Sequence, residues 1–282
     1  MTAVPAQTNP LYRPEVVIVA GCLIALIGFG VRSTAGLFTA PITEAHGWGR
    51  EVYGFAMAMQ NLVWGIATPL VGMMADKLGP MRVIKGGAVL YAAGLVLMAF
   101  AETPFLVTLG GGILMGLGIA TTSFAIVAAA FGRVVPPEKR SWAFGIATAA
   151  SSMGQFVFAP IGHAFIAAYG WQVALLLLAG ICLLMILFAL PLGVSKGGVA
   201  RGEIEVEITL GKTIRLALGH TSFVLLVAGF FVCGFQVAFI TVHLPPYLVE
   251  RGISASLAAW AIGIVGLFNV IGSYTAGVYG GY

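Results

Sequence analysis

Eight long apolar stretches dominate the chain and constrain what it can fold into. Each has about the 20 residues with which an α-helix crosses the hydrocarbon core of a bilayer. They cover residues 16–40, 53–75, 83–101, 105–131, 142–168, 172–191, 222–248 and 255–278. Only 9% of the residues are charged, against roughly a quarter in soluble domains. The sequence therefore predicts an all-α, polytopic membrane bundle of eight helices in the lipid bilayer.

The sequence carries no motif of an enzyme, a metal site or a bound cofactor. The first stretch is longer than the roughly 7 to 15 apolar residues of a cleaved signal peptide, which predicts a retained helix. The three cysteines, Cys22, Cys182 and Cys233, lie in different predicted helices and outside any CxxC or Cys/His spacing. The sequence also lacks phosphate-loop and HExxH motifs. We expect no disulfide, no metal, no cofactor and no enzymatic activity.

The positive charges are distributed unevenly over the predicted loops. Arg50 and Arg251 fall on one side of the membrane, and eleven other cations fall on the opposite side. The eleven are Arg13, Lys77, Arg82, Lys85, Arg133, Lys139, Arg140, Lys196, Arg201, Lys212 and Arg215. Because cytoplasmic loops are enriched in Lys and Arg, this bias predicts a cytoplasmic N-terminus in the cell membrane. The positive charges behind the net charge of +4 thus determine the topology of the chain in the membrane, and they indicate no nucleic acid partner.

One long hydrophilic interruption divides the chain into two unequal parts. We expect a six-helix bundle over residues 1–191, a cytoplasmic linker over 192–219, and the first two helices of a second bundle over 220–282. A weak internal repeat supports this division, because VVIVAG at 16–21 resembles VLLVAG at 224–229. Parallel repeats of six-helix halves are one plan of secondary transporters, with the substrate bound near the midplane. Chance similarity between apolar helices is the alternative.

The loop between the second and third stretches reads GMMADKLGPMR. It resembles the G-x-x-x-D-[RK]-x-G-x-R signature of the major facilitator superfamily. The matching residues are Gly72, Asp76, Lys77, Gly79 and Arg82. In that family the aspartate caps the second helix and meets a basic residue at the cytoplasmic end of helix four, which is Arg133 here. The resemblance implies a conformational latch, since a carboxylate is stabilised near helix N-termini and cations. An ordinary solvated turn is the alternative.

Further stretches resemble one subgroup of that superfamily. They are GFGVRSTAGLF, GWGREVYGFAMAMQNLVWG, FGRVVPPEKRSWAFGIATAASSMG and HLPPYLVERGIS. Together they look like bacterial monocarboxylate-type and oxalate/formate-exchanger-type facilitators, and the resemblance runs from Val16 to Tyr282. It implies twelve helices and transport of small organic anions, either with protons or by exchange.

The chain departs from that family pattern at three points. Residues 255–278 hold no charge where monocarboxylate transporters often have one. Gly112 stands where other members of the superfamily have an arginine in helix four. The chain also ends before the basic loop and the four further helices that the family implies. We therefore expect a fragment of a longer protein that acts as a monomer when complete.

Arg32 places a permanent charge inside the first apolar stretch. A charged side chain at the bilayer centre costs about 2.5 to 3.5 kcal/mol on insertion scales, so it normally faces the protein interior. Small residues, among them Gly21 and Gly28, share the helix face of Arg32, whereas leucines lie opposite. We expect Arg32 to point into the bundle and to bind a substrate carboxylate through its planar fork. Snorkelling outward or bonding a neighbouring carbonyl is the alternative.

Polar side chains at similar depth in other helices are candidate partners of Arg32 in a substrate site. The candidates are Gln60, Asn61, Trp64, Gln236, His243 and Asn269. Gln236 and His243 are seven residues apart and share a helix face. His243 is a candidate proton carrier, because the unperturbed pKa of a histidine lies near neutrality. Since Pro245 follows closely, capping the helix end is its alternative role.

These features favour one function over two others. We expect a secondary active transporter for small organic anions of monocarboxylate type, coupled to protons or working by exchange. An exporter of drugs or other metabolites with the same fold is the first alternative, although the predicted helices contain few acidic residues that would attract cations. A non-transporting membrane receptor is the second alternative, and the short loops argue against it.

Overall fold

A computed structural model describes residues 10–193 and 215–279 of the chain. Within these ranges the structure consists of helices and turns, with no β-strand. The main helices are α1 (Pro14–Ser33), α2 (Thr39–His46), α3 (Arg50–Leu78), α4 (Pro80–Ala99), α5 (Pro104–Val107), α6 (Met115–Thr121), α7 (Phe124–Val134), α8 (Arg140–Phe188), α10 (Thr221–Glu250) and α11 (Ala255–Tyr279). Short helical segments join them: η1 (Pro10–Tyr12), η2 (Ala35–Phe38), η3 (Thr108–Leu114), η4 (Pro137–Lys139) and η5 (Leu190–Leu192). The predicted all-α membrane architecture is confirmed.

All eight predicted stretches are helical, although their boundaries differ from those predicted. In the described part of the chain, six helical segments are long and apolar enough to cross a membrane. One of them, Pro137–Leu192, contains two predicted stretches that meet at Gly170, where φ is 80° and ψ is 164°. This backbone conformation is open almost only to glycine, so the chain turns there. The second predicted stretch forms α3 but is not among the six, since Gln60 and Asn61 lower its hydropathy.

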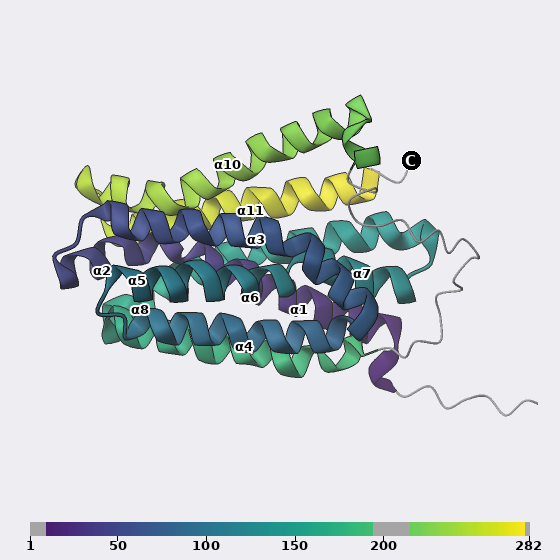
Figure 1. Cartoon of the computed structure of the whole chain (residues 1–282), viewed down its shortest axis with the longest axis horizontal. Coiled ribbons are helices and arrows are strands. Elements are labelled where there is room, and N and C mark those ends of the chain that lie inside the picture. The colour runs from purple at the N-terminus through teal and green to yellow at the C-terminus, as the bar shows by residue number, and fades with distance from the viewer. Residues whose placement is uncertain (1–9, 194–214, 280–282) are drawn as a thin grey trace, which may run out of the picture.

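The helices pack side by side along one direction (Figure 1). The long α8 contacts α1, α4 and α11, and α3 packs against η3 and α6. Glycines allow the closest of these contacts. A Cβ atom on Gly30 of α1 would lie 2.9 Å from the carbonyl oxygen of Gly154 on α8, and one on Gly118 would lie 2.7 Å from Tyr91 Cα on α4. Small residues thus bring the helix backbones together, as is usual in membrane bundles.

The penultimate helix, α10, contacts the rest of the bundle mainly at one end. Its buried residues are Thr241, Val242, Pro245 and Pro246, all in its last third. There it packs against η2, where a side chain on Gly36 would collide with the carbonyl oxygen of Thr241. The first two thirds of α10 diverge from the bundle (Figure 1). The bundle is therefore closed at the end where α10 finishes and splayed at the end where α10 begins.

The predicted domain boundaries stay predictions. Most of the predicted linker 192–219 lies outside the described residues, which resume at residue 215. Both sides of the proposed division nevertheless touch, because α11 packs along α8 and Gln155 donates a hydrogen bond of 3.2 Å to the Ile262 carbonyl.

Candidate functional site

Arg32 lies in the last turn of α1 with its guanidinium inside the protein. The residue is 5% exposed. Its Nη2 atom donates a hydrogen bond of 2.7 Å to Oδ1 of Asn61, and its guanidinium carbon lies 4.8 Å from the centre of the Trp64 ring. No carboxylate of the described residues pairs with it, and its buried Nε atom has no hydrogen-bond partner. Arg32 is thus an oriented cation with donor capacity left over.

Asn61, one of the two neighbours of Arg32 on α3, is held in place by a hydrogen bond within its own helix. Asn61 donates its own amide hydrogen to the Met57 carbonyl over 2.8 Å, which turns Oδ1 toward the guanidinium. Trp64 lies almost one turn farther along α3, so both side chains share one face. An aromatic face attracts a desolvated guanidinium through the ring quadrupole. Polar contact and ring together compensate for part of the cost of burying the charge.

Gln60, the residue before Asn61, anchors α3 rather than reaching the cavity. It is 2% exposed and donates a hydrogen bond of 2.7 Å to the carbonyl of Gly111. Gly111 belongs to η3, a π-helical segment in which the regular helical hydrogen bonds are shifted. A Cβ atom on Gly112 or Gly116 would lie about 3 Å from the α3 backbone, so glycine permits the contact. Gln60 thereby sets the position of α3 and of the residues that hold Arg32.

The face of α1 that carries Arg32 is buried as the small-residue pattern predicts. Gly21 and Gly28 are buried beside it. The hydroxyl of Tyr91 on α4 donates a hydrogen bond of 3.1 Å to the Gly28 carbonyl, one turn before Arg32. This hydrogen bond helps to fix the position of α1 along the bundle axis relative to α4.

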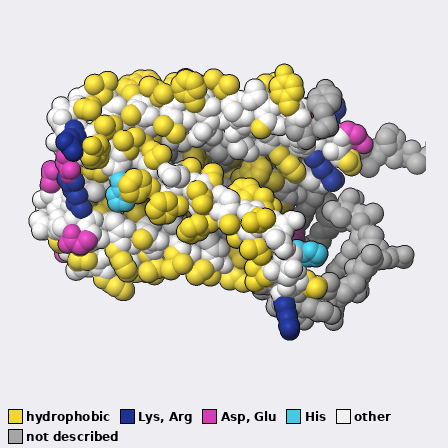
Figure 2. All heavy atoms as spheres, turned by 90° about the horizontal axis from the view of Figure 1, so that it is seen from above, with side chains coloured by type: hydrophobic (Ala, Val, Ile, Leu, Met, Phe, Trp, Pro, Cys, Tyr) yellow, Lys and Arg dark blue, Asp and Glu magenta, His cyan; other side chains and the backbone are white. Residues whose placement is uncertain are grey.

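A cavity of about 590 Å³ lies between α3 and α10. Asn61 and Trp64 line it from α3, so the polar cluster around Arg32 borders the cavity. His243 lines it from α10 together with an aromatic stripe of Phe230, Phe231, Phe235 and Phe239. Figure 2 shows a hollow on this face of the molecule, with hydrophobic side chains along it and charged ones gathered at the two ends. The cavity is thus mostly apolar, with a few polar groups on its wall.

The structure brings only some of the predicted site residues together. Asn61, Trp64 and His243 line one cavity. Arg32 is not in the lining but lies behind Asn61 and Trp64, and Gln60 is buried against η3. Gln236 is exposed and outside the lining, because it lies farther around α10 than the edge marked by His243. Asn269 is exposed on α11 and also outside the lining.

The aromatic stripe on α10 was not among the predicted site residues. The rings of Phe235 and Phe239 are stacked with centroids 6.2 Å apart, and those of Phe239 and His243 are 5.1 Å apart. Their spacing of four residues puts them on one helix face. That spacing was visible in the sequence, but phenylalanines four apart are equally typical of lipid-facing helices.

The predicted latch residues lie at the turn between α3 and α4. Gly79 has a φ of 87°, which favours glycine, and it lets Pro80 begin α4 directly after α3. Asp76, Lys77 and Arg82 are exposed around this turn, and Gly72 lies one turn before Asp76.

A basic residue at the start of α8 bonds the carbonyls at the end of α7, whereas the side chain of Arg133, the predicted partner of Asp76, lies outside the described part of the structure. Arg140 donates to the Gly132 carbonyl over 3.0 Å and to the Val135 carbonyl over 3.3 Å. A cation at a helix C-terminus is favourable because it satisfies free carbonyls and opposes the helix dipole. Arg140 thus ties the start of α8 to the end of α7.

Comparison with known proteins identifies the family. Residues 20–281 match the family described as Major Facilitator Superfamily. The chain belongs to the major facilitator superfamily. Monocarboxylate transporter 12 of Rattus norvegicus is 25% identical over 292 residues, covering 92% of this chain and 59% of the relative. Monocarboxylate transporter 13 of Rattus norvegicus is 25% identical over 270 residues, covering 94% and 60%. The chain thus spans about three fifths of the length of these relatives.

Solved structures of superfamily transporters share the fold. A D-xylose-proton symporter superposes with a TM-score of 0.60 at 18% identity, covering 92% of this chain and 66% of that chain. A bacterial homologue of the human lysosomal transporter Spinster, in an inward-facing and unoccupied conformation, gives 0.65 at 16% identity, covering 95% and 61%. Membership of the superfamily places the chain in a family of multi-pass membrane transporters, which are not enzymes.

Proposed function

We propose that this superfamily member forms most of a secondary active transporter that moves small organic anions of monocarboxylate type by alternating access. The observation that carries the proposal is Arg32, a buried cation with an unpartnered Nε atom beside a cavity of about 590 Å³. A buried charge normally has a partner of opposite sign, and here the described protein supplies an amide and a ring instead. A carboxylate ligand would complete the site through a charge-assisted bond to the guanidinium.

The cavity wall indicates which anions fit best. Its phenylalanines and Trp64 favour a carboxylate with an apolar remainder over a small inorganic anion. The similarity to monocarboxylate transporters 12 and 13 supports the same substrate class. His243, at the edge of the same cavity, is the candidate proton carrier of a proton-coupled cycle.

The bundle geometry suggests which side of the membrane the cavity faces. We infer that the splayed end is cytoplasmic, because most of the Lys and Arg residues lie in the loops at that end. The N-terminus is then cytoplasmic, and the turn around Asp76 and Gly79 is the latch that steadies one state of the transport cycle.

The test uses the complete transporter in proteoliposomes with a panel of labelled organic acids. We expect saturable uptake that organic acids compete for, and at least a tenfold rise in KM when Arg32→Gln removes the counter-charge, since a hydrogen bond to a charged group contributes about 1.5 to 3 kcal/mol. Arg13→Gln, at the exposed start of the same helix, is the matched control. Unchanged affinity in Arg32→Gln would contradict the proposal.

An imposed pH gradient in the same vesicles separates symport from exchange. We expect the gradient to stimulate uptake, and His243→Gln to remove that stimulation while leaving exchange of internal for external substrate intact. Competition by bulky apolar cations would instead support an exporter of drugs, and saturable binding without accumulation would support a receptor.

A further inference from the structure

A second cavity of about 280 Å³ lies at the closed end of the bundle. It is enclosed by the start of α2, the start of α3 and the last turns of α10. Gly54, Phe239, Val242 and His243 line both this cavity and the larger one. The two cavities are therefore neighbours along one route, with the Phe239 and His243 rings between them. We call the second one the outer cavity.

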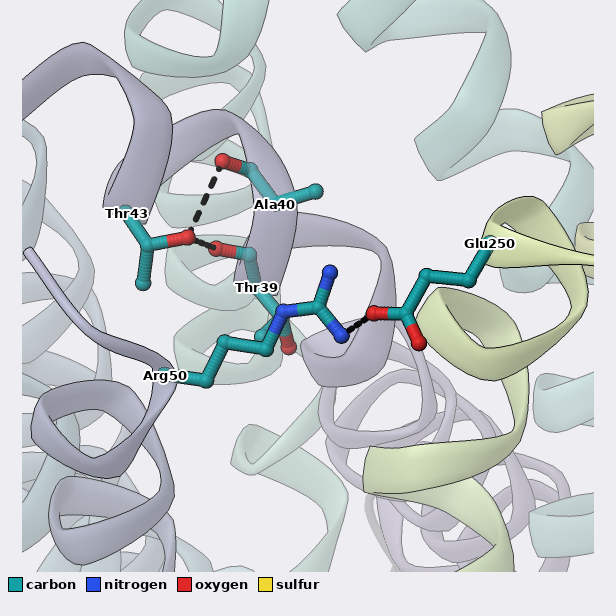
Figure 3. A network of polar contacts seen from close by, with 5 residues as sticks. All are labelled: Thr39, Ala40, Thr43, Arg50 and Glu250. Carbon is teal, nitrogen blue, oxygen red and sulfur yellow. Dashed lines mark hydrogen bonds and ion pairs between the residues drawn. The ribbon is translucent and has the colours of Figure 1, made fainter. Parts of the chain in front are cut away.

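The outer cavity has one arginine and one carboxylate in its lining, and they pair with each other. Arg50, the first residue of α3, forms an ion pair with Glu250, the last residue of α10. Figure 3 shows the two side chains reaching toward each other beside Thr39. The side chains are 52% and 45% exposed. Exposed pairs are weak because solvent screens them, so another carboxylate can replace Glu250 on the guanidinium.

Thr39 adds a donor that the protein itself leaves unused. It lines the outer cavity, is 5% exposed, and its buried Oγ1 atom has no hydrogen-bond partner. Its carbonyl is already occupied, because Thr43 donates a hydrogen bond of 2.7 Å to it (Figure 3). A buried hydroxyl without a partner is uncommon in folded proteins and calls for a ligand or another explanation.

Two arginines lie at this end, where the charge bias of the chain makes cations scarce. Apart from Arg32 inside α1, Arg50 and Arg251 are the two cations that fall outside the Lys- and Arg-rich loops. Arg251 lies outside the lining of the outer cavity, with its guanidinium carbon 5.3 Å from the centre of the Tyr247 ring. Of the two, Arg50 faces the outer cavity and is the cation that an anion in this cavity would meet.

We infer that the outer cavity is a second carboxylate-binding site, through which an anion enters before it reaches Arg32. The carboxylate replaces Glu250 on Arg50 and accepts a hydrogen bond from Thr39 Oγ1. Because the Arg50–Glu250 pair ties α3 to α10, its replacement also loosens the closed end of the bundle. The ligand class rests on the proposed function, whereas the site itself rests on the three side chains named here.

The test measures equilibrium binding of labelled lactate and oxalate to the complete transporter in nanodiscs. Every variant carries Arg32→Gln, so that the inner site does not contribute. We expect Glu250→Gln to tighten the remaining binding by about threefold to tenfold, since it frees the guanidinium, and Arg50→Gln to abolish it. Thr39→Val, which keeps the side-chain shape, should weaken binding in the Glu250→Gln protein. Arg50→Lys should restore part of it.

The direction of the two shifts distinguishes a binding site from a simple gate. If the pair only holds the helices together, Arg50→Gln and Glu250→Gln shift binding in the same direction, and that result would overturn the inference. Loss of all binding in the Arg32→Gln, Glu250→Gln protein would overturn it as well. Failure of the proposed function has a different signature, namely wild-type binding that Arg32→Gln alone leaves unchanged.

Discussion

At the scale of single residues, one buried cation contacts two side chains in the wall of the larger cavity. Arg32 is tolerated inside the bundle because Asn61 accepts a hydrogen bond from it and Trp64 presents its ring face. Neither contact neutralises the charge, and the Nε atom of the guanidinium keeps no hydrogen-bond partner. The orientation of Asn61 depends in turn on its own bond to the Met57 carbonyl.

Asn61→Leu tests this arrangement, because leucine has a similar size but cannot accept the hydrogen bond from Arg32. We expect a loss of about 1 to 3 kcal/mol in stability, since a buried charged donor loses its partner. Thermal unfolding in detergent measures the stability, and substrate KM should rise in parallel. Gln236→Leu is the matched control, because that amide is exposed on α10 and outside the cavity. Equal effects of the two variants would contradict the assigned role of Asn61.

At the scale of helices, glycines determine where elements turn and how closely they approach. Gly170 separates the two arms of α8 through a backbone conformation that other residues rarely adopt. The π-helical η3 exposes the Gly111 carbonyl to Gln60 and so positions α3. Both features act on the site from a distance, because they set the height and rotation of the helices that carry its residues.

Gly170→Ala tests the turn inside α8. We expect the variant to lose about 1 to 3 kcal/mol of stability, because a Cβ atom is strained at a φ of 80°. Gly180→Ala in the same helix is the control, since its Cβ would meet no atom within 4 Å and its φ is not positive. That change should leave stability equal or slightly higher, as alanine favours a helix. Unfolding temperatures of the two purified variants decide the point, and equal values would refute the role given to Gly170.

At the scale of the whole molecule, the structure is closed at one end and open at the other. The closed end is held together by the contact of η2 with the last third of α10. There Gly36 leaves room for the Thr241 carbonyl and Pro245. Since the first two thirds of α10 are exposed, this contact and the packing of α10 on α11 carry most of its attachment to the described part of the chain.

Gly36→Val should hold the closed end apart, because a side chain there collides with the backbone of α10. We expect a longer distance between spin labels at Ala45 and Val249, two exposed positions on α2 and α10, after the native cysteines are replaced by alanine. Transport should fall in parallel, since alternating access needs both states. Gly229→Val on α10 is the control, as a Cβ there meets no atom within 4 Å. An unchanged label distance in Gly36→Val would contradict this account of closure.

The sequence by itself determined the features that depend on local patterns. The lengths of the apolar stretches predicted the membrane helices. The glycines around Arg32 predicted which face of α1 is buried. The GMMADKLGPMR motif indicated the family, which the comparison confirmed. These properties depend on residues close together in the chain, so they can be deduced without knowing which helices meet.

Only the tertiary structure decided which polar side chains meet. Asn61 and Trp64 reach Arg32 because the contact of Gln60 with η3 sets the height of α3, whereas Gln236 lies a little too far around α10 to line the cavity. Arg50 and Glu250 are far apart in the sequence, and no local pattern paired them. Such contacts depend on the rotation, depth and tilt of whole helices, which follow from the packing of the entire bundle.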